Sequence, residues 1–379
     1  MKAIIHAELV LRDHLIPDAV LFMEDGVITG FGEMRNTVIP DNCEIIDAQD
    51  AYVGPGFVDI HCHCGGDTNI CDEPYAPSRA HLEKGTTTLL SALYFSDPKE
   101  ILLEQIKRVK AAIGKPGAEN LMGFYMEAPY MNPKFGADRT NCPWNKPVCK
   151  EDYQPLLDAA GDKVFVWAVA PEREHIEEFV RDAKKANPNV RFAVGHSEAE
   201  PHQIEALMPY GLCIGTHHTN ATGTITKYPE CRGVCVDEAV NYHNDIYAEL
   251  ICDSRGIHVD PYMQRLVRKI KGDDRVILIS DQSVPDAPNP PGYESVTDLS
   301  FDSTGEISGS RLCLSQACRN FMVHTGASVV DVFKMASYNP AKVIGLTDRG
   351  EVAVGKRADL VFVDHKMDVK KVILAGSEI

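Results

Sequence analysis

The stretch Gly54-Pro-Gly-Phe-Val-Asp-Ile-His-Cys-His63 decides how this chain is expected to fold. Its apolar run Phe57–Ile60 predicts a buried strand, and two histidines follow where that run ends. Because successive side chains in a strand alternate between its two faces, His61 and His63 point to the same side. The pair can therefore bring two imidazoles to one metal ion. The interleaved Cys62 and Cys64 are expected to face the other way.

Apolar runs of this kind recur along the middle of the chain, with helix-like segments between most of them. The eight runs are Phe57–Ile60, Thr86–Leu93, Leu121–Met126, Lys163–Val169, Arg191–Val194, Leu212–Gly215, Ile246–Ile251 and Arg275–Ile279. The helical segments include Asp97–Ile113, with Ser96 as its expected N-cap, and also Glu172–Asn187 and Asp260–Lys271. Alternating strands and helices predict parallel βα units, and eight units predict a closed (β/α)8 TIM barrel. An open doubly wound sheet would give the same local pattern.

The two ends of the chain have a different character, because they consist of short β-rich pieces broken by turns. We predict that residues 1–52 and 350–379 together form a small β-sandwich domain. Residues 53–349 then form the metal-dependent TIM-barrel catalytic domain. The length of 379 residues suits a barrel of roughly 250 residues with one small accessory domain.

Metal-binding residue types follow five of the predicted strands. They are His61, His63, Glu127, His196, His217 and Asp281. The carboxyl ends of barrel strands meet on one face, so these side chains are expected to converge there. Imidazole and carboxylate together suit a divalent metal, with one or two ions per subunit. Zinc is the first choice, and iron or another transition metal is the alternative. Asp281 is also the predicted catalytic residue, which takes a proton from water and returns it to a leaving amine.

Composition excludes several other classes of protein. The formal charge of −17 disfavours nucleic acid and anionic membranes as partners. No stretch approaches the roughly 18 consecutive apolar residues of a membrane span. The first residues lack the uninterrupted apolar core of a secretory signal, which predicts a cytoplasmic protein with its 12 cysteines reduced. The sequence also has no G-x-S-x-G nucleophile motif and no glycine-rich phosphate loop.

These motifs resemble the amidohydrolase superfamily and, within it, the N-acetylglucosamine-6-phosphate deacetylase family. The likeness runs over nearly the whole chain. Beyond the opening motif it includes Met126-Glu127-Ala128-Pro129, Val194-Gly-His196-Ser197, Thr216-His217, Asn220-Ala221, Gly256-Ile-His258-Val259 and Ser280-Asp281. The resemblance implies a homodimer that hydrolyses the N-acetyl group of an amino-sugar phosphate and releases acetate and the free amine.

The resemblance also implies roles for residues in the substrate loops. Asn220, Ala221 and His258 would contact the sugar phosphate, and Arg232 or Lys227 would reach the phosphate of the neighbouring subunit. The family usually has a histidine that polarises the acetyl carbonyl soon after the metal glutamate, whereas this sequence has none there. Arg139 is the candidate replacement.

Two other functions stay open from the sequence alone. One is an amidohydrolase with a different substrate, such as an N-acyl amine or a cyclic amide. The other is a barrel that binds metal without catalysis.

Overall fold

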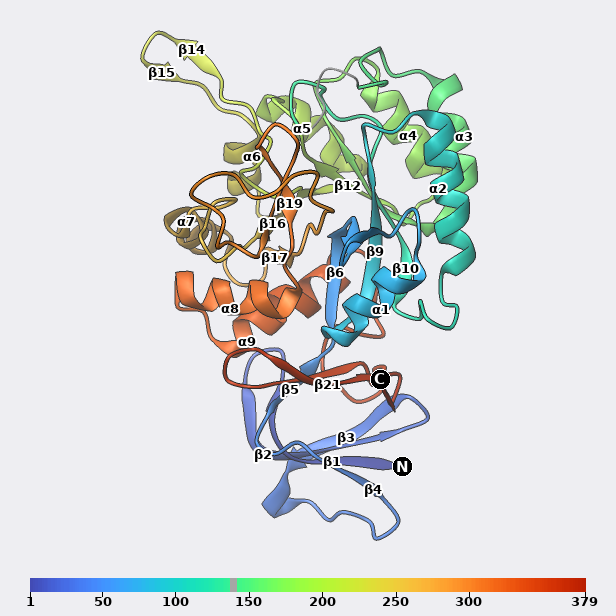
Figure 1. Cartoon of the computed structure of the whole chain (residues 1–379), viewed down its shortest axis with the longest axis vertical. Coiled ribbons are helices and arrows are strands. Elements are labelled where there is room, and N and C mark those ends of the chain that lie inside the picture. Colours follow the sequence, from blue (N-terminus) through green and yellow to red (C-terminus); the bar gives the residue numbers. More distant parts are fainter. Residues whose placement is uncertain (137–141) are drawn as a thin grey trace.

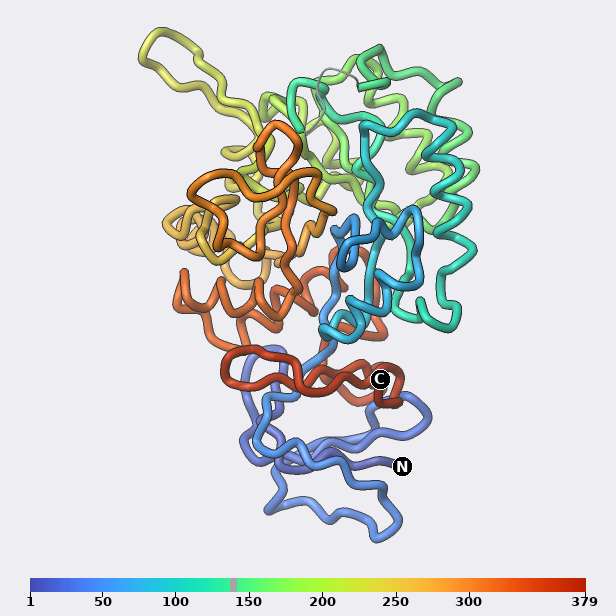
Figure 2. The backbone as a smooth tube through the Cα atoms, viewed as in Figure 1, coloured from blue at the N-terminus to red at the C-terminus, as the bar shows by residue number. Residues whose placement is uncertain are grey.

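A computed structural model describes residues 1–136 and 142–379 and shows two parts, a barrel and a small sheet domain (Figures 1 and 2). The chain begins in the sheet domain, runs through the whole barrel, and returns to the sheet domain. Both termini therefore lie in the sheet domain, at one end of the molecule (Figure 1).

Eight parallel strands make up the barrel, and each corresponds to one of the eight predicted runs. They are β6 (Phe57–Cys62), β9 (Thr86–Tyr94), β10 (Leu121–Glu127), β11 (Val164–Val169), β12 (Arg191–Val194), β13 (Leu212–Gly215), β16 (Tyr247–Ile251) and β17 (Val276–Ile279). They lie side by side in chain order from β6 to β17. The amide of Asp281 donates to the carbonyl of His61 at 3.0 Å, which links the last strand end to the first. The predicted TIM barrel is confirmed.

Helices connect the strands and pack around the barrel (Figure 1). They are α1 (Tyr75–Glu83), α2 (Lys99–Ala112), α3 (Lys150–Ala160), α4 (Ile176–Ala186), α5 (Pro201–Leu207), α6 (Val236–Tyr242), α7 (Pro261–Lys271), α8 (Leu314–Thr325), α9 (Val329–Phe333) and α10 (Asn339–Val343). The N-cap predicted for α2 was wrong. The helix begins after Pro98, which is extended and gives no side-chain cap, so Ser96 lies outside it.

The second domain is formed from both chain ends, as predicted. Its strands are β1 (Lys2–Val10), β2 (Leu15–Glu24), β3 (Val27–Glu33), β4 (Glu44–Asp47), β5 (Tyr52–Pro55), β20 (Leu360–Val363), β21 (Val369–Leu374) and β22 (Ser377–Glu378). All eight are hydrogen-bonded into one sheet, in which β20 joins the C-terminal strands to β5. The chain passes into the barrel at Gly56, where a Cβ atom would overlap the side chain of Thr87.

Two hairpins extend from the carboxyl end of the barrel. The first, β14 (Thr226–Tyr228) with β15 (Cys231–Arg232), projects away from the rest of the molecule (Figure 1). The second, β18 (Leu299–Phe301) with β19 (Ile307–Ser310), follows the long irregular stretch after β17.

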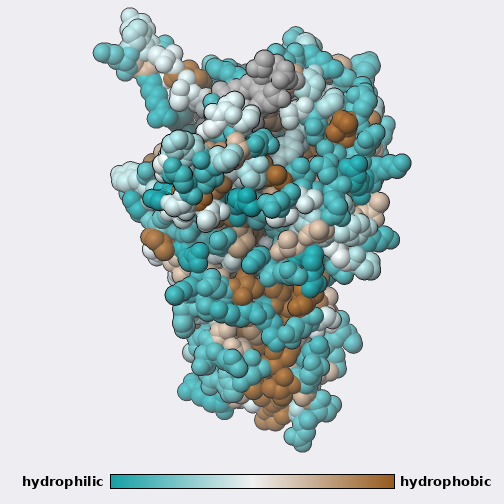
Figure 3. Space-filling view, viewed as in Figure 1, coloured by the Kyte–Doolittle hydropathy of each residue, from teal (hydrophilic) through white to brown (hydrophobic). Residues whose placement is uncertain are grey.

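The surface of the barrel is largely hydrophilic in the view of Figure 3, whereas apolar side chains gather in a band over the sheet domain. None of the helices within the described residues is both long and apolar enough to span a membrane.

Candidate metal centre and active site

The six predicted metal residues meet at the carboxyl end of the barrel. His61 and His63 come from β6 and its end, and Glu127 is the last residue of β10. The other three follow β12, β13 and β17 directly, and each has a positive backbone φ angle: 46° at His196, 27° at His217 and 46° at Asp281. Few non-glycine residues adopt such angles, and strain of this kind is concentrated at functional sites.

Glu127 lies at the centre of the group. Its Oε1 atom is 2.8 Å from His196 Nε2 and 3.0 Å from His217 Nε2. The same two ring nitrogens are only 3.0 Å apart. Two imidazoles and a carboxylate oxygen thus direct their ligand atoms at one small volume. Packing keeps the two histidines close, because a Cβ atom on Gly195 would lie 2.5 Å from the Cβ atom of Thr216.

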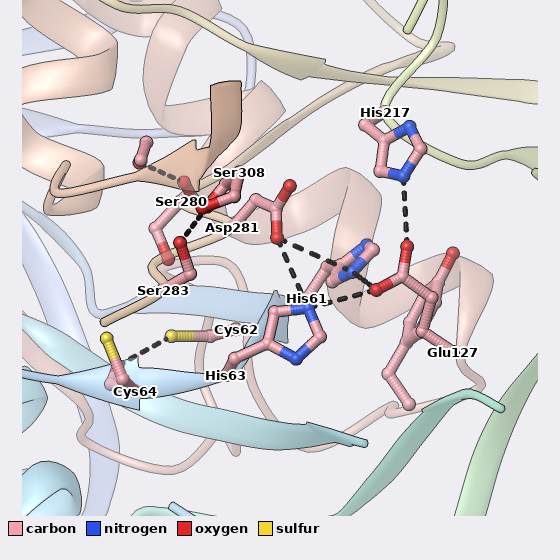
Figure 4. A network of polar contacts seen from close by, with 12 residues as sticks. His61, Cys62, His63, Cys64, Glu127, His217, Ser280, Asp281, Ser283 and Ser308 are labelled. Atoms are coloured by element: carbon pink, nitrogen blue, oxygen red, sulfur yellow. Dashed lines mark hydrogen bonds and ion pairs between the residues drawn. The ribbon is translucent and has the colours of Figure 1, made fainter. Parts of the chain in front are cut away.

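The other oxygen of Glu127 faces the histidine pair of the first strand (Figure 4). Glu127 Oε2 is 3.0 Å from His63 Nε2 and 3.5 Å from His61 Nε2. Asp281 Oδ1 faces the same two ring nitrogens, 3.4 Å from His63 Nε2 and 3.7 Å from His61 Nε2. Glu127 therefore belongs to two sets of ligand atoms, one with His61 and His63 and one with His196 and His217.

The charges of these buried groups depend on one another. Burial would raise the pKa of Glu127, but the neighbouring His61 and His196 outweigh this effect and hold the pKa well below its usual value. Burial also opposes ionisation of Asp281, and again His61 and His63 lower the pKa. Both carboxylates are therefore ionised at neutral pH.

His196 differs from the other three histidines in the direction of its pKa shift. Burial favours a neutral ring in His61, yet the charges of Glu127 and Asp281 raise its pKa well above the usual value. The balance is reversed at His196, where burial prevails and lowers the pKa. Both rings are buried among the other histidines and the two carboxylates.

The arrangement fits one or two divalent cations. With neutral imidazoles the six side chains carry two negative charges, and the ring nitrogens present unshared electron pairs toward them. His61 Nε2 is buried and has no hydrogen-bond partner, which is costly in the absence of a cation. Four imidazoles with two carboxylates form a typical ligand set for zinc or another transition metal.

A cavity of about 680 Å³ opens above the metal residues. Asn220, Ala221 and His258 line it, as do Ser283, Val284 and Asp286 from the irregular stretch after β17. The His258 ring is fixed by Asp253, whose Oδ2 is 3.2 Å from Nδ1 and also accepts from the His258 amide.

Neither Arg232 nor Lys227 lines this cavity in its own subunit. Arg232 lies on the projecting hairpin with 70% of its side chain exposed, and its guanidinium donates to Glu238 Oε1 at 2.5 Å. Lys227 lies on the same hairpin and does not line the cavity within its own subunit. Arg139 lies outside the described residues.

Two residues next to the metal residues, His218 and Cys62, face away from them. His217 turns its ring to Glu127, whereas His218 turns away and contacts Asn241 Oδ1 at 3.2 Å. Cys62 lies on the far side of its strand from the metal residues, with its Sγ 3.1 Å from the ring of His81 (Figure 4). The Cys62 thiol thus belongs to a separate buried group with Asp59 and His81, as the alternation of the strand predicts.

One polar residue of the site was missed from the sequence. Glu249 is in the middle of β16 with no exposed surface, and its Oε2 lies 3.4 Å from His61 Nδ1. The only signal was a charged residue inside an otherwise apolar strand.

Comparison with known proteins identifies relatives that align over nearly the whole chain. An N-acetylglucosamine-6-phosphate deacetylase of Bacillus subtilis (strain 168) is 28% identical, over 97% of this chain and 94% of the relative. An N-acetylgalactosamine-6-phosphate deacetylase of Escherichia coli O157:H7 is 26% identical, over 97% of this chain and 96% of the relative.

A solved structure of a related enzyme also matches the whole chain. It is a variant of N-acetyl-D-glucosamine-6-phosphate deacetylase from Mycobacterium smegmatis, in complex with N-acetyl-D-glucosamine-6-phosphate. It superposes with a TM-score of 0.82 at 25% identity, covering 100% of this chain and 98% of the other. The model of the Amidohydrolase family matches residues 52–379, which is most of the chain. This chain belongs to the amidohydrolase family.

Proposed function

We propose that this protein hydrolyses the N-acetyl group of an amino-sugar 6-phosphate and releases acetate and the free amine. The observation that carries the proposal is the position of Glu127. Its carboxylate lies between the pair His61 and His63 and the pair His196 and His217, and Asp281 lies beside the first pair. The related deacetylases, aligned over nearly the whole chain, supply the substrate class.

The residues that would hold the metal are His61, His63, Glu127, His196, His217 and Asp281. We propose zinc; one ion would be held by the group of His61, His63 and Glu127, and a second by the group of Glu127, His196 and His217. A divalent ion at such a site supplies polarisation of the amide carbonyl and a lowered pKa for attacking water.

Asp281 is placed to move the proton. It is ionised before the reaction, and one of its oxygens faces His61 and His63 (Figure 4). In the proposed reaction Asp281 accepts a proton from the attacking water. It then returns this proton to the nitrogen of the leaving amine as the amide bond breaks.

The sugar would lie in the cavity above these groups. Asn220, Ala221 and His258 line that cavity, and Asp253 fixes the orientation of the His258 ring. Lys134 also lines the cavity and pairs with Glu198. The described residues that line the cavity therefore provide little positive charge for a phosphate.

We propose that a second subunit provides the missing positive charge. The β14–β15 hairpin projects from the body of its subunit and carries both Lys227 and Arg232 (Figure 1). A homodimer in which this hairpin reaches the neighbouring cavity would place one of these residues on the phosphate. Arg232 would first have to break its hydrogen bond to Glu238 before it could contact the phosphate.

An acetate-release screen tests the proposed function. The substrates are N-acetylglucosamine and N-acetylgalactosamine, each with and without a 6-phosphate, because relatives of both specificities align with the chain. N-acyl amino acids and cyclic amides are included in the same screen. We expect acetate from at least one 6-phosphate sugar and much less from its unphosphorylated form. Metal-loaded protein that releases no acetate from either phosphate would contradict the proposal and favour another substrate or a non-catalytic metal-binding barrel.

A further inference from the structure

Glu249 is a buried carboxylate whose position is unusual for a barrel strand. The other residues of β16 are apolar or aromatic, and the Glu249 side chain has no exposed surface. Across residues 1–136 and 142–379, no lysine or arginine forms an ion pair with it. A charged group in such surroundings costs several kcal/mol unless other polar groups compensate it.

The partners of Glu249 all belong to the metal centre or support it. Its Oε2 atom is 3.4 Å from His61 Nδ1, accepts from the His217 amide at 3.2 Å, and accepts from the Tyr125 hydroxyl at 3.3 Å. The Tyr125 ring stacks on the His61 ring with centroids 4.2 Å apart, and its hydroxyl also contacts Thr216 Oγ1 at 2.8 Å.

The His61 ring therefore lies between two carboxylates. Its Nδ1 faces Glu249 at 3.4 Å, and its Nε2 faces Glu127 at 3.5 Å. A carboxylate accepts hydrogen bonds and does not donate them, so Glu249 favours the form of the ring with its proton on Nδ1. In that form the electron pair of Nε2 is free and points toward Glu127.

We propose that Glu249 is a positioning residue that fixes the tautomer and orientation of His61 for metal binding and, through the His217 amide, connects the two histidine pairs. This role rests on the proposed metal centre, because Glu249 itself contributes no ligand atom. Partners behind metal-binding histidines act in this way in other proteins, and their loss typically weakens metal affinity by roughly 10- to 100-fold.

The test measures zinc affinity by competition with a chromophoric chelator in the wild type, E249Q and E249A. Gln keeps the size of Glu249 but removes the charge and can donate to Nδ1, whereas Ala removes the group. We expect at least one zinc ion to bind roughly 10- to 100-fold more weakly in both variants. The melting temperature of metal-free E249Q separates this role from a structural one. It should fall little, because Gln keeps the size of Glu249 and its oxygen can still accept from the His217 amide and the Tyr125 hydroxyl.

Asp298→Asn provides the matched control. Asp298 is also a buried carboxylate, but its partners are Ser254 and Asn320 rather than the metal residues. This variant should melt at a lower temperature and keep wild-type zinc affinity. If E249A does not fold, E249Q retains the shape of the side chain and carries the test.

A second measurement addresses the tautomer directly. In zinc-loaded protein with 15N-labelled histidine, long-range 1H–15N spectra should show His61 with its proton on Nδ1 in the wild type and an altered Nδ1 signal in E249Q. Wild-type zinc affinity in folded E249Q, or an unchanged His61 spectrum, would overturn the role of Glu249 alone. A wild-type protein that binds no zinc would overturn the proposed metal centre as well.

Discussion

Asp281→Asn should abolish most of the turnover while the fold stays intact. The backbone of this residue holds two elements together, since its amide donates to the His61 carbonyl at 3.0 Å and its carbonyl accepts from Ser310 at 2.8 Å. The substitution leaves both bonds in place. Asn also tolerates the φ angle of 46° at this position about as well as Asp. The change is therefore confined to the carboxylate that faces His61 and His63.

An amide at this position cannot accept and return a proton. Loss of a general acid–base group lowers kcat by about 100- to 10,000-fold, which corresponds to about 3 to 5 kcal/mol of transition-state free energy. The assay is acetate release at saturating sugar phosphate, with metal content measured by elemental analysis and stability by thermal melting. The control is Asp158→Asn, which removes an exposed carboxylate from α3 and should leave all three unchanged. Turnover within tenfold of wild type in metal-replete Asp281→Asn would show that another group transfers the proton.

Three other perturbations test separate parts of the account. His196→Ala should remove most bound metal, whereas His202→Ala, an exposed histidine on α5, should not; equal metal content by elemental analysis would reject His196 as a ligand. Arg232→Ala should raise KM for the 6-phosphate sugar much more than for the unphosphorylated one, and an equal change in both would remove its phosphate role. Stability of the metal-free, reduced protein should fall above about pH 9, because burial raises the pKa of Cys71 to about 12 and that of Cys213 to about 11. Unfolded thiols ionise near pH 8.5, so the folded state holds these protons longer and rising pH favours unfolding. Urea denaturation between pH 7 and pH 10 measures this loss, and a flat profile would contradict it.

The fold could be predicted from the sequence because the signal for buried parallel strands is strong. Each run such as Arg191–Val194 or Leu212–Gly215 is a short apolar segment between helices, and the strands β12 and β13 have those same bounds. The metal residues could be predicted for a related reason. The carboxyl ends of barrel strands converge, so position along the chain already gives approximate position in space.

Features that depend on neighbours distant in sequence could not be predicted. The β14–β15 hairpin consists of exposed residues such as Thr226 and Lys227, which give no alternating apolar pattern. The sequence pattern did not show that α2 begins after Pro98 and not after Ser96, because the start of the helix depends on the local backbone conformation. The role of Glu249 can be inferred only from its contact with His61, which lies 188 positions away in the chain.

The central claim is that Glu127 shares its carboxylate between ligand sets built from four histidines. Anomalous diffraction from crystals grown with zinc, recorded on both sides of the zinc absorption edge, tests it most directly. The account predicts a peak about 2.0 to 2.2 Å from a Glu127 oxygen and from Nε2 of His196 and His217, with a second peak beside His61 and His63 if both positions are filled. Zinc peaks only at other places in a fully loaded crystal would contradict it.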